Sequence, residues 1–311
     1  MLSEKFLIDH HKIKFLIFAF AFSLLLFSCT KTPEKVEKKF SVKDDAGIDV
    51  KFSSHPERII SLGPNITETI YALGADTLLY GVTEFCDYPE DAKSKTNTGS
   101  YLSPDYEIIS SLKPDLIIVN VESSNNPTYQ SLKNMGYNLF LSHAKDIEGI
   151  FKMINDIGMI TNREDNANIL FNSISDQLKY KDPSSVQKKE KTVLILIAIN
   201  PMMTTNKNTF INEIALLAGL KNIYSEEDQE YPVINYEDVV SKNPAYIIFP
   251  ADTLDTEKIE IYKKELTDKL YNSDAIKNGN LIFIDDDIMF RPGPRITDAV
   301  KTLRAHIKSE F

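Results

Sequence analysis

The sequence of 311 residues has no tryptophan, only two cysteines and only five histidines. Two cysteines allow one disulfide bond at most, so a chain of this length must be held together by the packing of apolar side chains. Acidic residues outnumber basic ones by 45 to 35. This balance argues against a nucleic-acid partner, because binding to phosphates needs an excess of Lys and Arg. The sequence has no nucleophile–base arrangement, phosphate-binding loop or zinc-protease motif, so we expect no enzyme.

Long apolar runs are also missing. The longest lies near the N-terminus, Phe15–Phe27, and has 13 residues, whereas a transmembrane helix needs roughly 17–25. Lysines precede this run and "LFSC" ends it at Cys29, which is typical of a secretory signal and similar to a bacterial lipobox. We expect residues 1–28 to be removed and Cys29 to carry a lipid such as palmitate, which would anchor the protein to the periplasmic or outer face of a bacterial membrane. The alternative is an uncleaved membrane anchor with an incidental cysteine.

The segment after Cys29, "TKTPEKVEKKFSVKDD", is rich in Lys and Glu and has few large apolar residues. Such a segment buries too little surface to order itself, so residues 29–50 are expected to form a flexible tether. The mature chain then has 283 residues, with 32 basic and 43 acidic side chains and a net charge of −11. That length suffices for two modest domains. With Cys29 lipidated, Cys86 has no disulfide partner, and we expect a small buried residue rather than a nucleophile.

Short apolar runs alternate with helical patterns from about Lys51 onward. The apolar runs are "RIISL", "LIIV" and "NLFLS" in the first half, and "TVLILIAI", "YIIF" and "LIFI" in the second. Helical spacing occurs in "TETIYALGA", "FINEIALLAGL" and "ITDAVKTLRAHI". This alternation is typical of βαβ units with mostly parallel sheets. We therefore predict an α/β fold with two Rossmann-like lobes, at residues 51–143 and 190–311.

Residues 144–183 are predicted to link the lobes. An apolar stripe begins with Ile147, Ile150, Phe151, Ile154 and Ile157. The stripe resumes at Ile169 after a polar interval, and no proline follows until Pro183. We expect one long helix, of about 35 residues and roughly 50 Å at ~1.5 Å per residue. Two separate helices, broken at Gly158 or within "TNRED", are the alternative.

One stretch occurs twice. "YLSPDYEIISSLKPDLIIV", Tyr101–Val119, recurs 130 residues later as "YPVINYEDVVSKNPAYIIF", Tyr231–Phe249. Asp105 or Asn235 is placed to cap a short helix in each copy, with Glu107 or Glu237 in its first turn. The helix dipole alone explains an acidic residue there, since it stabilises an exposed carboxylate by typically ~0.3–1 kcal/mol. The repeat also predicts equivalent outer positions for the two glutamates, one on each lobe.

Several motifs, in order, resemble the periplasmic binding proteins that serve ABC importers of vitamin B12, ferric siderophores and haem. They are "PERIISLGPNITETIYALGADTLLYGVTEFCDYPEDAK", "YEIISSLKPDLIIV", "FINEIALLAGLKNIY", "YPVINYEDVVSKNPAYIIF" and "RPGPRITDAVKTL". The likeness covers about Phe52 to the C-terminus and is closest to the vitamin-B12-binding members. It implies two α/β lobes joined by one long helix, with a ligand captured between the lobes and delivered to a permease and its ATPase.

The resemblance also implies roles for particular residues. The family's docking glutamates fall at Glu107 and Glu237. Cleft aromatic residues of the B12-binding members fall at Phe85, Tyr101 and Tyr231.

Those members place several tryptophans in the cleft, whereas this chain has none and carries Asn120 at one such position. A cobalamin-like ligand is the first expectation, and haem or a ferric siderophore is the alternative. We expect a monomer without a resident cofactor. An alternative from another functional class is a surface lipoprotein that binds a partner and has no role in transport.

A few other residues are candidates because of their own chemistry. Met202, in "NPMMTTNK", follows a buried run and is a candidate contact for an apolar ligand, or a gap-filling core residue. Arg291 is the candidate partner for an anionic group of the ligand, whereas Arg295 is expected to be structural. Asp285–Asp287 is expected to be a capping cluster. Three histidines lie outside the predicted signal, and they are His55, His143 and His306. They are scattered along the sequence, so no metal site is expected.

Overall fold

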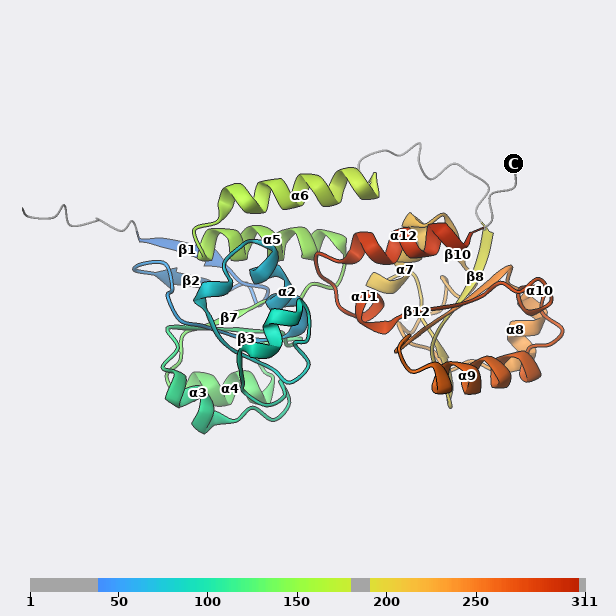
Figure 1. The fold of residues 1–311 in the computed structure, drawn as a ribbon, viewed down its shortest axis with the longest axis horizontal. Helices are drawn as coiled ribbons and strands as arrows, with labels where there is room; N and C mark the ends of the chain where they lie inside the picture. The colour runs from blue at the N-terminus through green and yellow to red at the C-terminus, as the bar shows by residue number, and fades with distance from the viewer. Residues whose placement is uncertain (1–38, 180–190, 308–311) are drawn as a thin grey trace, which may run out of the picture. The chain divides into compact units, whose positions relative to one another are not determined.

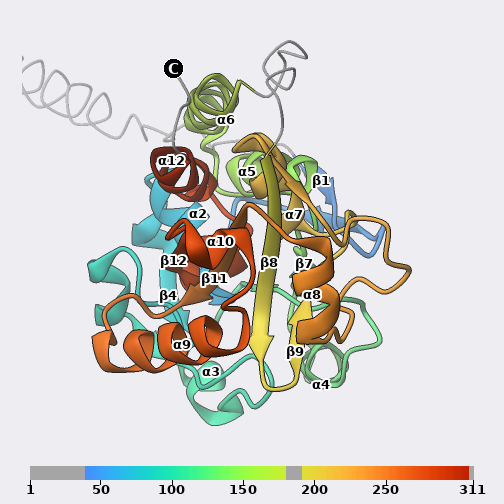
Figure 2. The same cartoon turned by 90° about the vertical axis from the view of Figure 1, so that its right-hand side faces the viewer.

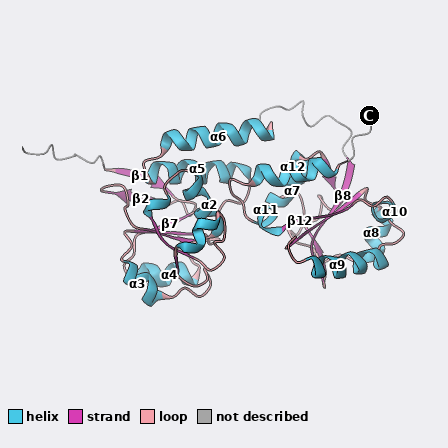
Figure 3. Cartoon of the chain, in the orientation of Figure 1, coloured by secondary structure: helices cyan, strands magenta, loops and turns pink. Residues whose placement is uncertain are grey.

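The structure is a computed structural model that describes residues 39–179 and 191–307, all within the compact unit Lys39–Phe311. Its elements form two mostly parallel sheets with helices packed against them (Figure 1), so the predicted α/β fold is confirmed. Figure 3 shows the alternation of strands and helices along the chain. The first sheet has the order β5-β4-β3-β6-β7 and is parallel throughout. Its strands are β3 (Ile59–Leu62), β4 (Leu79–Val82), β5 (Thr96–Asn97), β6 (Leu116–Val119) and β7 (Leu139–Leu141).

The N-terminal lobe consists of this sheet and its helices. They are α2 (Pro64–Ala72), the short 3₁₀ helices η1 (Asp76–Leu78) and η2 (Glu90–Ser94), α3 (Tyr106–Leu112) and α4 (Pro127–Asn134). Strand residues alternate between two apolar clusters, because successive side chains point to opposite faces of a sheet. Ile59 packs in the cluster that includes α2, while Ile60 packs in the one that includes α3 and α4.

The C-terminal lobe contains the second sheet, in the order β10-β8-β11-β12, with β9 paired antiparallel to β8 (Figure 2). Its strands are β8 (Lys191–Ile199), β9 (Met202–Thr204), β10 (Leu220–Asn222), β11 (Tyr246–Ala251) and β12 (Leu281–Asp285). Its helices are α7 (Phe210–Leu217), α8 (Tyr236–Lys242), α9 (Thr256–Lys269), α10 (Asp274–Lys277), α11 (Asp286–Phe290) and α12 (Ile296–His306). One continuous apolar cluster runs from α2 of the first lobe to α7 and α12 of the second, so the two lobes share a core.

The prediction of one long linking helix is wrong. The segment contains two helices, α5 (Ile147–Ile160) and α6 (Glu164–Leu178), which lie side by side. The chain reverses at Asn162, whose positive φ of 55° ends the helical path. Gly158 permits the close approach, because a Cβ there would stand 2.6 Å from the Cβ of Ala167 on α6. The break therefore falls within "TNRED", the alternative that the sequence left open.

The prediction of a tether for residues 29–50 is wrong for residues 40–50. A β-hairpin forms from β1 (Phe40–Lys43) and β2 (Asp49–Phe52). Val42, Val50 and Phe52 are buried in the shared core, and these few apolar residues suffice because they share one face. The side chain of Asp44 accepts from the amides of Ala46 (3.0 Å) and Ile48 (2.8 Å), which closes the turn. Cys29 and the rest of the tether lie outside the described residues.

The duplicated stretch forms the same unit twice, as predicted. Asp105 accepts from the amides of Glu107 and Ile108 at the start of α3, and Asn235 accepts from the amide of Asp238 at the start of α8. Each helix ends on a residue with positive φ, Lys113 at 49° and Asn243 at 43°. The strands β6 and β11 follow. Glu107 and Glu237 are both exposed in the first turn.

Cys86 is buried and free, as expected, and burial raises the pKa of its thiol. Within residues 39–179 and 191–307, no helix has the length and apolar character needed to cross a membrane.

Candidate functional site

A cavity of about 450 Å³ lies at the carboxyl ends of the strands of the first sheet. Residues that follow every one of its strands line this cavity, because parallel strands present all their carboxyl ends at one edge. The volume is within the range of small-molecule sites, roughly 300–1,000 Å³. The C-terminal lobe contributes the loop after α11. The lining is Leu62, Gly63, Pro64, Asn65, Phe85, Tyr101, Leu102, Asn120, Val121, Glu122, Asn126, His143, Phe290, Arg291 and Pro292.

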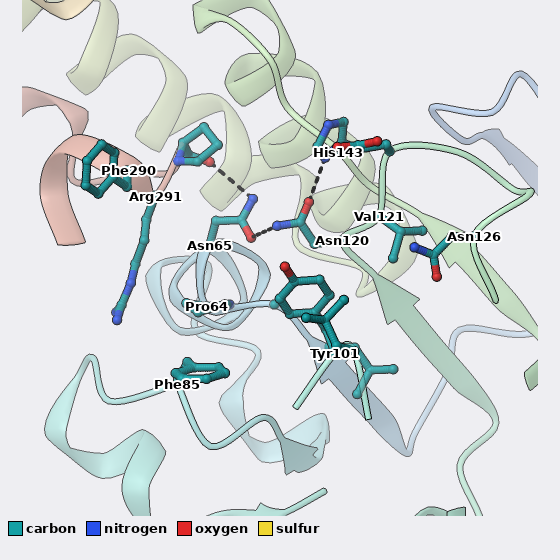
Figure 4. A pocket seen from close by; sticks show the side chains of 15 residues that line it. Pro64, Asn65, Phe85, Tyr101, Asn120, Val121, Asn126, His143, Phe290 and Arg291 are labelled. Atoms are coloured by element: carbon teal, nitrogen blue, oxygen red, sulfur yellow. Dashed lines mark hydrogen bonds between the residues drawn. The ribbon is translucent and has the colours of Figure 1, made fainter. Parts of the chain in front are cut away.

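A row of polar side chains crosses the cavity (Figure 4). The amide nitrogen of Asn65 donates to the carbonyl of Pro292 (3.3 Å), and Asn120 donates to Asn65 Oδ1 (3.1 Å). Asn120 Oδ1 lies 2.9 Å from Nδ1 of His143. Gly63 makes the row feasible, because a Cβ there would stand 2.7 Å from the Cβ of Asn120.

Aromatic and aliphatic side chains provide the apolar surface. Tyr101 lies beside the polar row, and Phe85 lies farther along the cavity (Figure 4). The exposed fractions are 50% for Phe85, 38% for Tyr101 and 71% for Leu102. These values are high for apolar side chains, so a ligand that covered them would gain from their burial. The site therefore combines flat apolar surface with a few fixed hydrogen-bonding groups.

Among the described residues, the one guanidinium that lines the cavity is already paired with carboxylates. Arg291 contacts Asp87 (2.6 Å), Asp287 (2.5 Å) and Glu68 (3.4 Å). Figure 4 shows its guanidinium end directed away from the polar row. Burial is the main cause that raises the pKa of Asp287 to about 6. Arg291 opposes this rise, and the negative charges of Asp87 and two neighbouring aspartates add to it. An anionic ligand would therefore have to compete with three carboxylates of the protein for Arg291, the residue predicted to bind it.

Glu68, on α2, is the buried centre of this network, with 3% of its surface exposed. Arg295 donates to it twice, at 2.8 Å and 2.6 Å, which is the structural role expected for Arg295. The guanidinium of Arg295 also lies 4.2 Å from the ring centroid of Tyr88. The ion pairs therefore join α2 of the N-terminal lobe to the loop and helix that end the C-terminal lobe.

Glu68→Ala is expected to lower the free energy of unfolding by about 3–5 kcal/mol, because it leaves buried guanidinium groups with fewer partners. A urea titration followed by circular dichroism measures the loss. Asp87→Asn, at a side chain that is 46% exposed, is the control and should cost less than about 1 kcal/mol. Equal effects of the two variants would contradict the central role of Glu68.

The structure brings together only part of the predicted ligand set. Phe85, Tyr101 and Arg291 line the cavity, whereas Met202 and Tyr231 do not. Met202 is 4% exposed and packs in an apolar cluster of the C-terminal lobe. It is therefore a core residue, which was the alternative to a ligand contact. Tyr231 is 46% exposed.

Tyr231 departs from Tyr101 because of β9, which has no counterpart in the first copy of the repeat. The segment before α8 pairs with β9: Thr204 donates to the carbonyl of Pro232 (3.1 Å), and Ile234 donates to that of Met202 (3.0 Å). This pairing holds the loop that carries Tyr231 along the strand. The duplicated sequence therefore gives equivalent helices but not equivalent loops.

His143 belongs to the cavity, although no sequence pattern separates it from the other histidines. His55 Nδ1 lies 3.0 Å from the carbonyl of Ile160, and His306 Nδ1 lies 2.8 Å from that of Thr302. The place of Asn120 and His143 in the sequence could have indicated this role, because both come directly after apolar runs that form strands. In the described part of the chain, no three His, Cys, Asp or Glu side chains are grouped to hold a metal ion. Asp285 caps α11, as expected.

Comparisons with known proteins agree with this architecture. The profile of the family "Periplasmic binding protein" matches residues 59–288. The ABC transporter substrate-binding lipoprotein YvrC of Bacillus subtilis (strain 168) is 29% identical over 286 residues, covering 89% of this chain and 88% of the relative. The vitamin B12-binding protein of Vibrio vulnificus (strain CMCP6) is 27% identical and covers 81% and 90%. A solved structure from Staphylococcus epidermidis ATCC 12228, described as a possible iron-binding periplasmic solute-binding protein, is 28% identical with a TM-score of 0.70, covering 82% and 100%.

Proposed function

Because the chain belongs to the periplasmic binding protein family, we propose that it is the lipid-anchored solute-binding protein of an ABC importer. In this proposal it captures a cobalamin-like metal chelate in the cavity and delivers it to a permease at the membrane. The observation that carries the choice of ligand is the charge of the cavity. Arg291 carries the one fixed positive charge that the described part of the chain places on its lining, and three carboxylates surround that charge.

A neutral ligand edged with amides suits such a cavity better than an anionic one. A corrinoid carries amide side chains around its ring, whereas haem and many siderophore chelates carry carboxylates or a net negative charge. Asn65, Asn120 and Asn126 supply groups that pair with amides, and Glu122 would repel a carboxylate. The exposed rings of Phe85 and Tyr101 suit the apolar face of a macrocycle.

A binding titration with purified protein tests the proposal. Cobalamin, dicyanocobinamide, haemin and a ferric siderophore are compared by isothermal calorimetry under one buffer condition. We expect the two corrinoids to bind most tightly. Preference for haemin or the siderophore would replace the ligand and keep the transport role, and failure of all four ligands would favour a surface interaction lipoprotein.

Haem is the second candidate because the Tyr101 hydroxyl lies at the cavity. A tyrosinate binds ferric iron directly in catalase. If haemin binds in this way, Tyr101→Phe should remove the tyrosinate-to-iron charge-transfer band. With a corrinoid, the same variant should keep near-native affinity, because the ring alone makes the contact.

Lipid anchoring at Cys29 is expected from the "LFSC" signal and the polar segment that follows it. Mass spectrometry of the protein extracted from membranes should show Cys29 as the first residue, carrying acyl chains. Cys29→Ser should release the protein from the membrane fraction. An N-terminus upstream of residue 29, or an unmodified cysteine, would contradict the anchor.

A further inference from the structure

We propose that His143 determines specificity for ligands edged with amides, because its Nε2 accepts a hydrogen bond from an amide N–H of the bound chelate. This inference rests on the proposed function and adds a chemical selection rule to it. A ligand with carboxylates in place of amides has no donor to offer at this position.

The direction of the polar row fixes which nitrogen of His143 carries the proton. Asn65 Nδ2 contacts two acceptors, the carbonyl of Pro292 (3.3 Å) and the sulfur of Met153 (3.7 Å), so the amide end of Asn65 is the donor side. Its Oδ1 then accepts from Asn120 (3.1 Å). That leaves Oδ1 of Asn120 facing Nδ1 of His143 at 2.9 Å. An oxygen can only accept there, so Nδ1 carries the hydrogen.

A neutral imidazole with its hydrogen on Nδ1 has a lone pair on Nε2. Burial lowers the pKa of His143, and Lys145 lowers it further, against the opposing charges of Glu122 and Asp45. The ring is therefore neutral at pH 7. Nδ1 forms the hydrogen bond to Asn120, whereas no described residue forms a hydrogen bond with Nε2. His143 also lines the cavity. Nε2 is thus an acceptor that no residue of ranges 39–179 and 191–307 occupies, on a side chain that lines the cavity.

The position of the His143 backbone is also fixed. Its amide donates to Asp45 (2.7 Å), in the turn of the β1–β2 hairpin. Asp45 is held in turn by its own amide, which donates to the carbonyl of Leu141 (3.0 Å), and by Lys152, at 2.8 Å. A side chain with a fixed backbone and a fixed tautomer pays little entropy to form a hydrogen bond, which favours selectivity.

The same geometry disfavours a carboxylate at this position. A carboxylate oxygen would meet the lone pair of Nε2, with Glu122 on the same lining, and neither group can donate. A ligand that covers this half-buried acceptor without a matching donor leaves it unpaired, and such a ligand is disfavoured.

The test compares two corrinoids that differ in these groups, dicyanocobinamide with amides and dicyanocobyrinic acid with carboxylates. Wild-type protein should bind the amide form more tightly. His143→Phe keeps a ring and removes both nitrogens, so affinity for the amide form should fall roughly tenfold. Affinity for the acid form should not fall and should rise if a carboxylate meets Nε2 in the wild type. His143→Gln, which restores an acceptor, should recover part of the loss. His306→Phe, far along the chain on α12, is the matched control and should change neither affinity.

Asn120→Asp provides a second, independent variant. The new carboxylate beside Nδ1 would favour the imidazolium form of His143, in which both nitrogens donate. The preference should then shift toward the acid form. The inference is overturned if wild type binds the amide form but His143→Phe leaves that affinity unchanged, or if Asn120→Asp keeps the wild-type preference. Failure of wild type to bind either corrinoid overturns the proposed choice of a cobalamin-like ligand and the inference together, whereas loss of selectivity alone overturns only the inference.

Discussion

Alanine at both Phe85 and Tyr101 is expected to lower ligand affinity by about a hundredfold to ten-thousandfold while the protein remains folded. Each side chain offers apolar surface that a macrocycle would cover, and losing such contact costs roughly 1.5–3 kcal/mol per ring. Both residues lie on loops after strands and are largely exposed, at 50% and 38%. Their removal therefore leaves no core cavity. Calorimetric titration with dicyanocobinamide measures the loss, and thermal unfolding confirms the fold.

Tyr231→Ala separates the sequence-based site from the cavity. The resemblance places Tyr231 among the ligand contacts, whereas the structure places it outside the cavity lining. If the cavity is the whole site, Tyr231→Ala should match the control Tyr271→Ala, at another exposed tyrosine (64%). Adding Tyr231→Ala to the double variant should then change nothing further. Native affinity in the double variant would mean that the ligand binds elsewhere on the chain.

The central strands of the sheets were predictable because they are short, mostly apolar and bounded by turn residues. "LIIV" forms β6 and "YIIF" forms most of β11, since few other conformations bury four consecutive apolar side chains. The helical hairpin was not predictable in the same way. A helix reversal needs only one residue with positive φ, here Asn162, and the apolar stripe continues on both sides of it. Periodicity reports which face is buried and not whether the helix turns back.

The candidate site was predictable only in part, for a similar reason. Phe85 and Tyr101 were expected from the resemblance, and both line the cavity. His143 and Asn65 were missed, because their role depends on strand ends that meet only in the folded sheet. Tyr231 does not line the cavity, because hydrogen bonds to β9 redirect its loop, and these bonds leave no mark in the duplicated pattern. Local sequence thus predicts elements better than it predicts which loops converge.

Arginine at both Glu107 and Glu237 is expected to abolish uptake while ligand affinity stays within error. The two carboxylates occupy equivalent exposed positions, in the first turns of α3 and α8. No described side chain forms an ion pair with either carboxylate among the salt bridges of the structure. Both are therefore available to basic residues of a permease, as the family resemblance implies. Neither lines the cavity, so capture and delivery should separate.

Glu164→Arg with Glu257→Arg is the matched control for this variant. These glutamates are also exposed in the first turns of helices, α6 and α9, so the change of charge and the loss of helix-dipole stabilisation, about 0.3–1 kcal/mol per site, are alike. Uptake of labelled vitamin B12 is measured in cells that express the full chain with its permease and ATPase, and affinity is measured on the purified variants. We expect the control to transport normally. A similar transport defect in the control would show that charge alone stops uptake, and a collapse of affinity in the Glu107 and Glu237 variant would show that these residues act in capture.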